Sequence, residues 1–171
     1  MLDKLIAIAS AEVGVREVGS NNCGPRIREY QYATDLTPAA WPWCAAFTCW
    51  CIAKWVEDKE VEKWLALKSR TPFQWRPKTA AAYGFKTWAL DRPNTTDIYD
   101  EKQKAQLGDI VTFDFSHVGL IVEDRGDTIL TIEGNTNGKG ERDSTSGDGV
   151  WRKVRAKSLV RDIIRIHPSI K

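Results

Sequence analysis

Apolar residues recur at helical spacing in the first part of the chain and at alternating spacing toward its end. The apolar positions between Leu2 and Val13 share one helical face, which predicts a helix over residues 3–13. Pro25 suits the first turn of a second, short helix that continues through Tyr30. The N-terminal part is therefore expected to be helical.

The segment around Cys44 combines helix breakers with a long apolar pattern. Two residue–proline pairs, the second ending at Pro42, interrupt regular structure, and helical spacing resumes directly after them. This pattern predicts a helix of about a dozen residues with Cys44 in its first turn. Residues 78–90 predict a further helix, and the remainder of 60–104 gives no clear pattern.

Alternation of apolar and polar residues begins near residue 107 and is typical of strands. A segment rich in Gly, Ser, Thr, Asn and Asp over 136–149 predicts a long loop. Helices followed by strands predict an α+β fold, with N-terminal helices packed on a C-terminal antiparallel sheet in one domain over 1–171. The expected strands are 110–113, 117–123, 127–133, 149–154 and 161–166.

One predicted hairpin brings an imidazole to a carboxylate. His117 lies on the face of its strand opposite Val118 and Leu120, and a three-residue loop ending at Gly126 would pair Glu123 with Asp127. Counting back along both strands places His117 directly across from Glu133, with Asn135 one diagonal away. A carboxylate that holds a histidine is the general-base half of a nucleophilic triad, and an incidental pair on a surface hairpin is the alternative.

Composition excludes several classes of protein. The 171 residues are 42% hydrophobic and 28% charged, with a net charge of +2, as in a globular protein. The sequence contains no basic block of the kind that predicts nucleic-acid binding. No apolar run approaches the roughly 20 residues that span a bilayer. The N-terminus lacks the apolar core of a signal peptide, so we expect synthesis in the cytoplasm.

Cysteine and tryptophan supply the remaining chemistry. The cysteines crowd too closely for a disulfide framework and lack zinc-ligand spacing, so neither a metal nor a cofactor is expected. The first turn of a helix favours the thiolate, which makes Cys44 a candidate nucleophile; a small buried hydrophobe is the alternative. The eight tryptophans predict core packing or a groove for sugar or peptide, and Trp41 and Trp43 are the candidates for substrate contact.

Four short motifs in order resemble the signature of CHAP hydrolases, the cysteine- and histidine-dependent amidohydrolases and peptidases. The resemblance covers most of residues 5–152 and implies a papain-like fold and cleavage of an amide in peptidoglycan. It implies Cys44 as nucleophile, His117 as base, Glu133 as its orienting group and Asn135 as a fourth polar member. The motifs are Trp43-Cys44-Ala45-Ala46-Phe47, Gly108-Asp109-Ile110-Val111, Ser116-His117-Val118-Gly119 and Glu133-Gly134-Asn135.

The chain departs from this family pattern in three places. The stretch 21–25 has no carboxylate cluster, so the calcium loop of some relatives is not expected. The length leaves no room for the wall-binding module of many relatives, and the segment 56–78, rich in charge and Trp, has no clear counterpart.

Three functions remain open from the sequence. The first is a peptidoglycan hydrolase that acts on the wall after release or delivery. As a phage or prophage endolysin it would depend on a holin, and as an antibacterial toxin it would have an immunity protein. The second is an amidase on a small peptide conjugate such as a glutathione amide. The third is a catalytically silent module that binds glycan or protein. A monomer is expected in each case.

Overall fold

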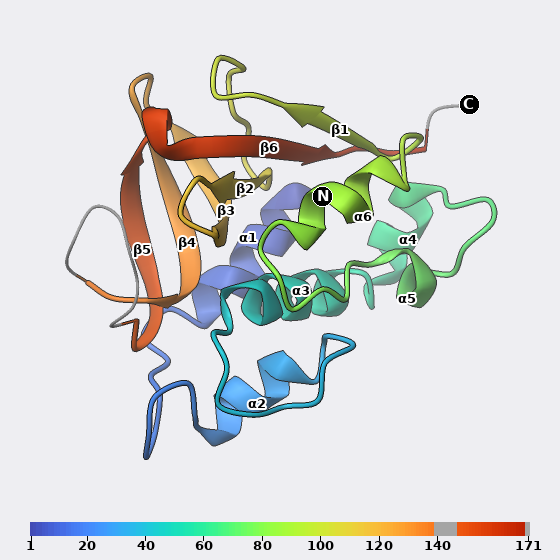
Figure 1. The fold of residues 1–171 in the computed structure, drawn as a ribbon. Helices are drawn as coiled ribbons and strands as arrows, with labels where there is room; N and C mark the ends of the chain where they lie inside the picture. Colours follow the sequence, from blue (N-terminus) through green and yellow to red (C-terminus); the bar gives the residue numbers. More distant parts are fainter. Residues whose placement is uncertain (139–146, 170–171) are drawn as a thin grey trace.

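The computed structural model describes residues 1–138 and 147–169, and it places six helices before or beside a six-stranded sheet (Figure 1). This arrangement confirms the predicted α+β fold with N-terminal helices packed on an antiparallel sheet. The helices are α1 (Leu2–Ala11), α2 (Pro25–Gln31), α3 (Cys44–Trp55), α4 (Lys59–Leu65), α5 (Pro72–Trp75) and α6 (Gly84–Leu90). The strands are β1 (Thr96–Tyr99), β2 (Ile110–Phe113), β3 (His117–Asp124), β4 (Thr128–Thr136), β5 (Gly149–Ala156) and β6 (Val160–Ile166).

The helix predictions hold best where the apolar pattern is longest. α2 and α3 begin at the predicted residues, whereas α1 ends at Ala11, two residues early. The predicted helix over 78–90 is wrong in its first part, because Thr79 bonds the Ala81 amide through its side chain and holds a turn there. The unassigned region contains α4, α5 and the edge strand β1.

The sheet has the strand order β1-β6-β2-β3-β4-β5, and each neighbouring pair is antiparallel. The predicted strands are all present, with end points that differ by up to three residues. The predicted loop over 136–149 falls partly outside the described residues. α3 lies between α2 and the sheet and packs on β3 and β4 (Figure 1).

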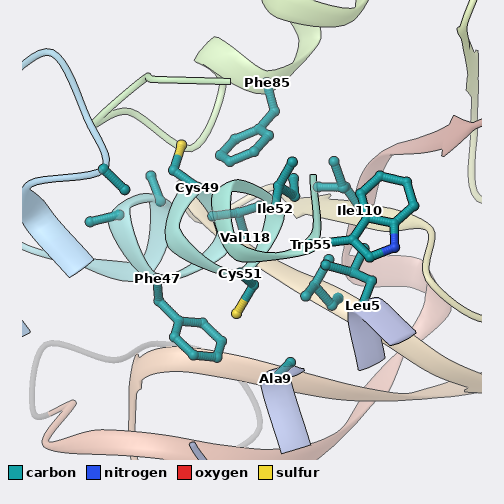
Figure 2. Packing of buried hydrophobic residues seen from close by; sticks show 14 of the residues in the cluster. Leu5, Ala9, Phe47, Cys49, Cys51, Ile52, Trp55, Phe85, Ile110 and Val118 are labelled. Atoms are coloured by element: carbon teal, nitrogen blue, oxygen red, sulfur yellow. The ribbon is translucent and has the colours of Figure 1, made fainter. Parts of the chain in front are cut away.

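Alternation along β3 assigns its residues to two apolar clusters. Val118 and Leu120 pack toward α3, whereas Ile121 faces the second cluster with Phe113 on the other side of the sheet. His117 shares the face of Ile121, as predicted. Figure 2 shows α3 enclosed by side chains from α1, α6 and the sheet. α3 is therefore held by apolar contacts around most of its surface, which fixes the position of its first turn.

Tryptophans and cysteines contribute many of the side chains in this core. Trp43, Trp55 and Trp75 are completely buried, and Trp88 is nearly so. All four cysteines are free thiols; Cys49 and Cys51 are sealed inside, whereas Cys23 is partly exposed. Within the described ranges, no helix has the length and hydrophobicity to cross a membrane.

Candidate active site

Cys44 is the first residue of α3. The break at Pro42 keeps the preceding backbone out of the helix, and the N-cap residue Trp43 makes no side-chain capping bond. The first-turn N–H groups therefore have no side-chain cap and point toward the start of the helix, an environment that favours negative charge. Cys44 is 6% exposed, unlike Cys49 and Cys51, which are fully buried.

His117 is the first residue of β3 and follows a tight turn. Ser116 has a left-handed φ of 61°, and its backbone N–H donates to the Tyr83 hydroxyl over 2.9 Å. The same hydroxyl donates to the Asp114 carbonyl at 3.0 Å, so Tyr83 bridges the turn. The His117 ring stacks on Phe115 with centroids 5.8 Å apart. Backbone and ring contacts together hold the imidazole in one orientation.

The two ring nitrogens of His117 have different partners. Nε2 lies 2.9 Å from Glu133 Oε2. Cys44 lies close enough to the same ring to raise its pKa, and Nδ1 is the ring nitrogen that Glu133 leaves free to face it. Burial alone lowers the pKa of His117, but Cys44 and Glu133 outweigh burial and raise the pKa to about 9. The protonated imidazolium is therefore the favoured form of His117 at neutral pH.

Glu133 is fully buried, and every one of its acceptor positions is engaged. Arg155 donates from Nε to Oε1 at 2.9 Å and from Nη2 to Oε2 at 2.5 Å, and Thr131 donates its hydroxyl to Oε1 at 2.6 Å. Burial alone would raise the pKa of Glu133, yet Arg155 and His117 lower it to about 2. Glu133 is thus a fixed carboxylate that orients His117 and stabilises its positive charge.

The predicted register of the β3–β4 hairpin is wrong, although the predicted pair exists. Leu120 lies opposite Ile132 and Glu123 opposite Leu130, with a bulge between Ile121 and Glu123. If the pairing of Leu120 with Ile132 is extended toward the start of β3, Glu133 lies opposite Gly119 and not opposite His117. The residue opposite His117 is therefore displaced by two positions along β4 from the predicted one. Because side chains alternate between the two faces of a sheet with a period of two, Glu133 still lies on the same face as His117.

Gly119 makes this diagonal contact possible. A Cβ atom on Gly119 would lie 2.7 Å from Glu133 Cγ, closer than such atoms approach in proteins. The Glu133 side chain therefore crosses over Gly119 to reach His117. Gly119 is the last residue of the motif Ser116-His117-Val118-Gly119, but its structural role was not predicted from the sequence.

Asn135 lies at the irregularity between Glu133 and Thr136, with a left-handed φ of 53°. It is 5% exposed, and its side-chain amide makes no hydrogen bond to the described residues. Its place on the strand that carries Glu133 keeps it close to the site. Its role as a fourth polar member remains a prediction.

The two predicted substrate-binding tryptophans lie in different environments. Trp43 is completely buried, stacks on Tyr30 and donates its indole N–H to Glu17 at 2.8 Å, so its predicted contact with substrate is wrong. The break at Pro42 turns its ring under α3 and into the core. Trp41 is half-buried and donates to the Thr37 carbonyl, so its contact with substrate remains a prediction.

Sequence reasoning missed Arg155, Thr131 and Tyr83. Arg155 lay one residue beyond the predicted end of its strand, and a charged residue in a strand normally suggests an exposed face. Only the tertiary packing reveals that it is fully buried against Glu133. Tyr83 is distant in sequence from the turn that it bridges, so no local pattern indicates it. Among the described residues, no group of three potential His, Cys, Asp or Glu ligands could hold a metal.

Comparison with known proteins identifies the family. The model of the CHAP domain matches residues 36–135, more than half of the chain. Two solved structures share the fold: Ly7917 (TM-score 0.55, 16% identity) and Ly7917 with the hydrolyzing product of MDP (TM-score 0.55, 14% identity). Each alignment covers 98% of this chain, which spans 62% and 63% of the respective Ly7917 chains. No curated protein matches. The matched segment contains Cys44, His117, Glu133 and Asn135, and the chain belongs to the CHAP domain family.

Proposed function

We propose that the protein is a peptidoglycan hydrolase that cleaves an amide bond by cysteine nucleophilic catalysis. One observation carries the proposal: Cys44 at the start of α3 lies close enough to His117 to raise its pKa, and the buried Glu133 holds Nε2 of the same ring at 2.9 Å. This is the arrangement that acyl transfer through a thiol requires. The similarity to Ly7917, solved with the hydrolyzing product of MDP, a peptidoglycan-derived compound, supports the substrate class.

The proposed reaction has two steps. The Cys44 thiolate attacks the carbonyl carbon of the amide, and the backbone N–H groups that begin α3 stabilise the oxyanion. His117 then donates its proton to the leaving amine as the C–N bond breaks, which leaves an acyl-enzyme. In the second step His117 accepts a proton from water, the hydroxide attacks the thioester, and the carboxylic acid is released with the Cys44 thiolate and the protonated His117 restored.

The other residues act on His117 or on the substrate. Glu133 keeps the ring oriented and stabilises its charge, and Asn135 is proposed as a polar contact near the reacting groups. Trp41 is proposed as a substrate contact because part of its ring remains accessible. Release as an endolysin or delivery as an antibacterial toxin would bring the enzyme to the wall, and we propose a monomer in either setting.

The test is digestion of purified peptidoglycan sacculi by the wild-type protein and by Cys44→Ala. We expect the wild-type protein to reduce turbidity and the variant to be inactive. Mass spectrometry of the products distinguishes cleavage in the stem peptide, in the cross-bridge and at the sugar–peptide junction. Equal turbidity loss from both proteins, or none from either, would contradict the proposal.

A glutathione amide and intact sacculi in parallel reactions separate the alternative functions. Release of ammonia from the small conjugate without digestion of sacculi would favour the amidase. Binding to sacculi that is unchanged by Cys44→Ala, without any product, would favour a silent binding module.

A further inference from the structure

Arg76 is a buried cation without a carboxylate partner. It is 9% exposed, and no carboxylate oxygen of the described residues lies within the 4.0 Å of an ion pair. Among hydrogen bonds to the described residues, Arg76 donates through Nη1 alone, to the Ala33 carbonyl at 2.6 Å and to the Pro77 carbonyl at 3.2 Å. Burial lowers the pKa of Arg76, because the protein compensates its charge incompletely. A buried guanidinium normally pairs with an anion.

The guanidinium borders an open pocket of about 940 Å³. Lys78 lines the same pocket, and apolar surface comes from Leu36, Ala80, Ala81 and Trp88. Arg76 and Lys78 both approach the Phe73 ring, at 4.9 and 4.0 Å, which holds the two cations near each other. The pocket therefore combines cationic donors with small apolar contacts.

This pocket lies beside the segments that build the active site. The Asp35 amide donates to the Lys78 carbonyl at 2.8 Å, which ties the pocket to the segment that leads into Cys44. Cys49 of α3 contacts the Thr79 carbonyl at 3.4 Å. Figure 1 shows the segment between α5 and α6 running along α3. A chain-like substrate held at Cys44 could extend along this segment into the pocket.

The charges that line the pocket favour a carboxylate. Arg92 and Asp91 form an ion pair with each other at 3.0 Å, which leaves Arg76 and Lys78 against the single carboxylate of Asp35. The side chains that line the pocket therefore carry a net charge of one positive unit, which suits a singly charged anion better than a polyphosphate. The planar guanidinium also matches the two oxygens of a carboxylate.

We infer that this pocket is a carboxylate-binding subsite for the peptide part of the substrate, with Arg76 as the main anion-binding group and Lys78 as the second. The inference rests on the proposed function and deepens it. It predicts that the enzyme distinguishes peptides with a free carboxylate from the corresponding carboxamides.

The test measures binding to full-length Cys44→Ala protein by calorimetry, so it does not depend on turnover. The probes are N-acetyl-L-alanyl-D-isoglutamine, which has one carboxylate, and the same dipeptide with that carboxylate converted to a carboxamide. We expect the carboxylate form to bind about tenfold or more tightly, because a charge-assisted hydrogen bond is lost in the amide. Arg76→Gln should abolish this preference, and Lys78→Gln should reduce it.

Arg125→Gln is the matched control, because Arg125 lies on the distant β3–β4 hairpin and pairs with Glu123. It should leave the preference unchanged. If Arg76→Gln fails to fold by circular dichroism, Arg76→Lys keeps the charge but loses the guanidinium, and it should weaken carboxylate binding. Equal binding of both probes, no binding of either, or an intact preference in folded Arg76 variants would overturn the inference.

The two proposals fail separately. Digestion of sacculi by wild-type protein without carboxylate preference overturns the subsite alone. A carboxylate preference that depends on Arg76, in a protein that leaves sacculi intact, overturns the proposed substrate and retains the subsite.

Discussion

At the scale of single residues, the site is a chain of alternating charges with little access to water. Arg155 neutralises Glu133, Glu133 supports the positive charge of His117, and His117 faces Cys44. Each charge is buried, so removal of one partner leaves the next without compensation. The charge of His117 therefore depends on Arg155, which acts on it through Glu133.

The pH dependence of activity follows from the pKa of His117. The active form carries a protonated His117, and the raised pKa of about 9 keeps this form populated from acid through neutral pH. We expect kcat/KM to fall as pH rises through about 9, where the imidazolium loses its proton. The measurement is the pH profile of kcat/KM on a soluble peptidoglycan fragment.

Glu133→Gln tests the origin of this profile. The variant removes the hydrogen bond and the charge that raise the pKa of His117, so the alkaline fall should move to lower pH. Activity should drop about 100-fold or more, since the imidazolium loses its stabilising anion. Thr131→Val, which removes the neutral bond to Glu133 and a longer one to the Lys153 carbonyl, is the milder comparison. An alkaline limb that does not move in Glu133→Gln would refute the assignment.

At the scale of elements, two contacts place His117 relative to its partners. Gly119 lets the β4 carboxylate cross β3, and Tyr83 at the N-cap of α6 bridges the turn that begins β3. Neither residue reacts with substrate. Both are positioning residues, and their effects should appear in kcat more than in KM.

Gly119→Ala should separate Glu133 from His117. The new methyl group meets Glu133 Cγ, so we expect a large loss of kcat and a decrease of about 1–3 kcal/mol in the free energy of unfolding. Gly126→Ala at the tip of the same hairpin is the control. Its Cβ meets nothing within 4 Å, and only its positive φ of 88° is unfavourable, so stability should fall while kcat remains. Equal kcat in the two variants would disprove the steric role of Gly119.

Tyr83→Phe should loosen the turn before His117. The variant removes both hydrogen bonds of the hydroxyl, to the Ser116 amide and the Asp114 carbonyl, and keeps the ring. We expect kcat to fall about tenfold with little change in KM, and the free energy of unfolding to fall by about 1 kcal/mol. Tyr32→Phe, at a 70% exposed position, controls for loss of a hydroxyl. An unchanged kcat together with the stability loss would show that Tyr83 is only structural.

At the scale of the whole molecule, packing decides which thiol can react. Cys49 and Cys51 are sealed in the core around α3, and burial raises the pKa of both thiols (Figure 2). Cys44 is at the end of the same helix, where the core opens. The fold therefore presents one of three neighbouring thiols for chemistry.

Alkylation of the native protein with iodoacetamide should follow this order. Cys44 should react first, the partly exposed Cys23 more slowly, and Cys49 and Cys51 only after unfolding in urea. Mass spectrometry of peptides at successive times measures the four rates. His117→Ala should slow Cys44 toward the rate of Cys23, because the imidazolium no longer stabilises the thiolate. Similar native rates for Cys44, Cys49 and Cys51 would contradict an activated thiol.

Local patterns in the chain were sufficient for α1 to α3, for β2 to β6 and for the order of the chemical groups, but not for α4, α5 and β1. Helical spacing after Pro42 predicted the start of α3 at Cys44, and alternation predicted that His117 and Glu133 share one face of the sheet. These features depend on backbone sterics and on the period of each element, and both act between residues that are near in sequence.

Contacts between distant segments required the folded structure. The turn after Asp124 and the bulge in β3 together set the hairpin register, Gly119 allowed the diagonal contact, and Arg155 from β5 neutralised Glu133. The same packing buried Trp43 and left Arg76 at a pocket. Burial and charge compensation depend on every segment that packs around a group. The sequence pattern of a single segment therefore predicts neither of them.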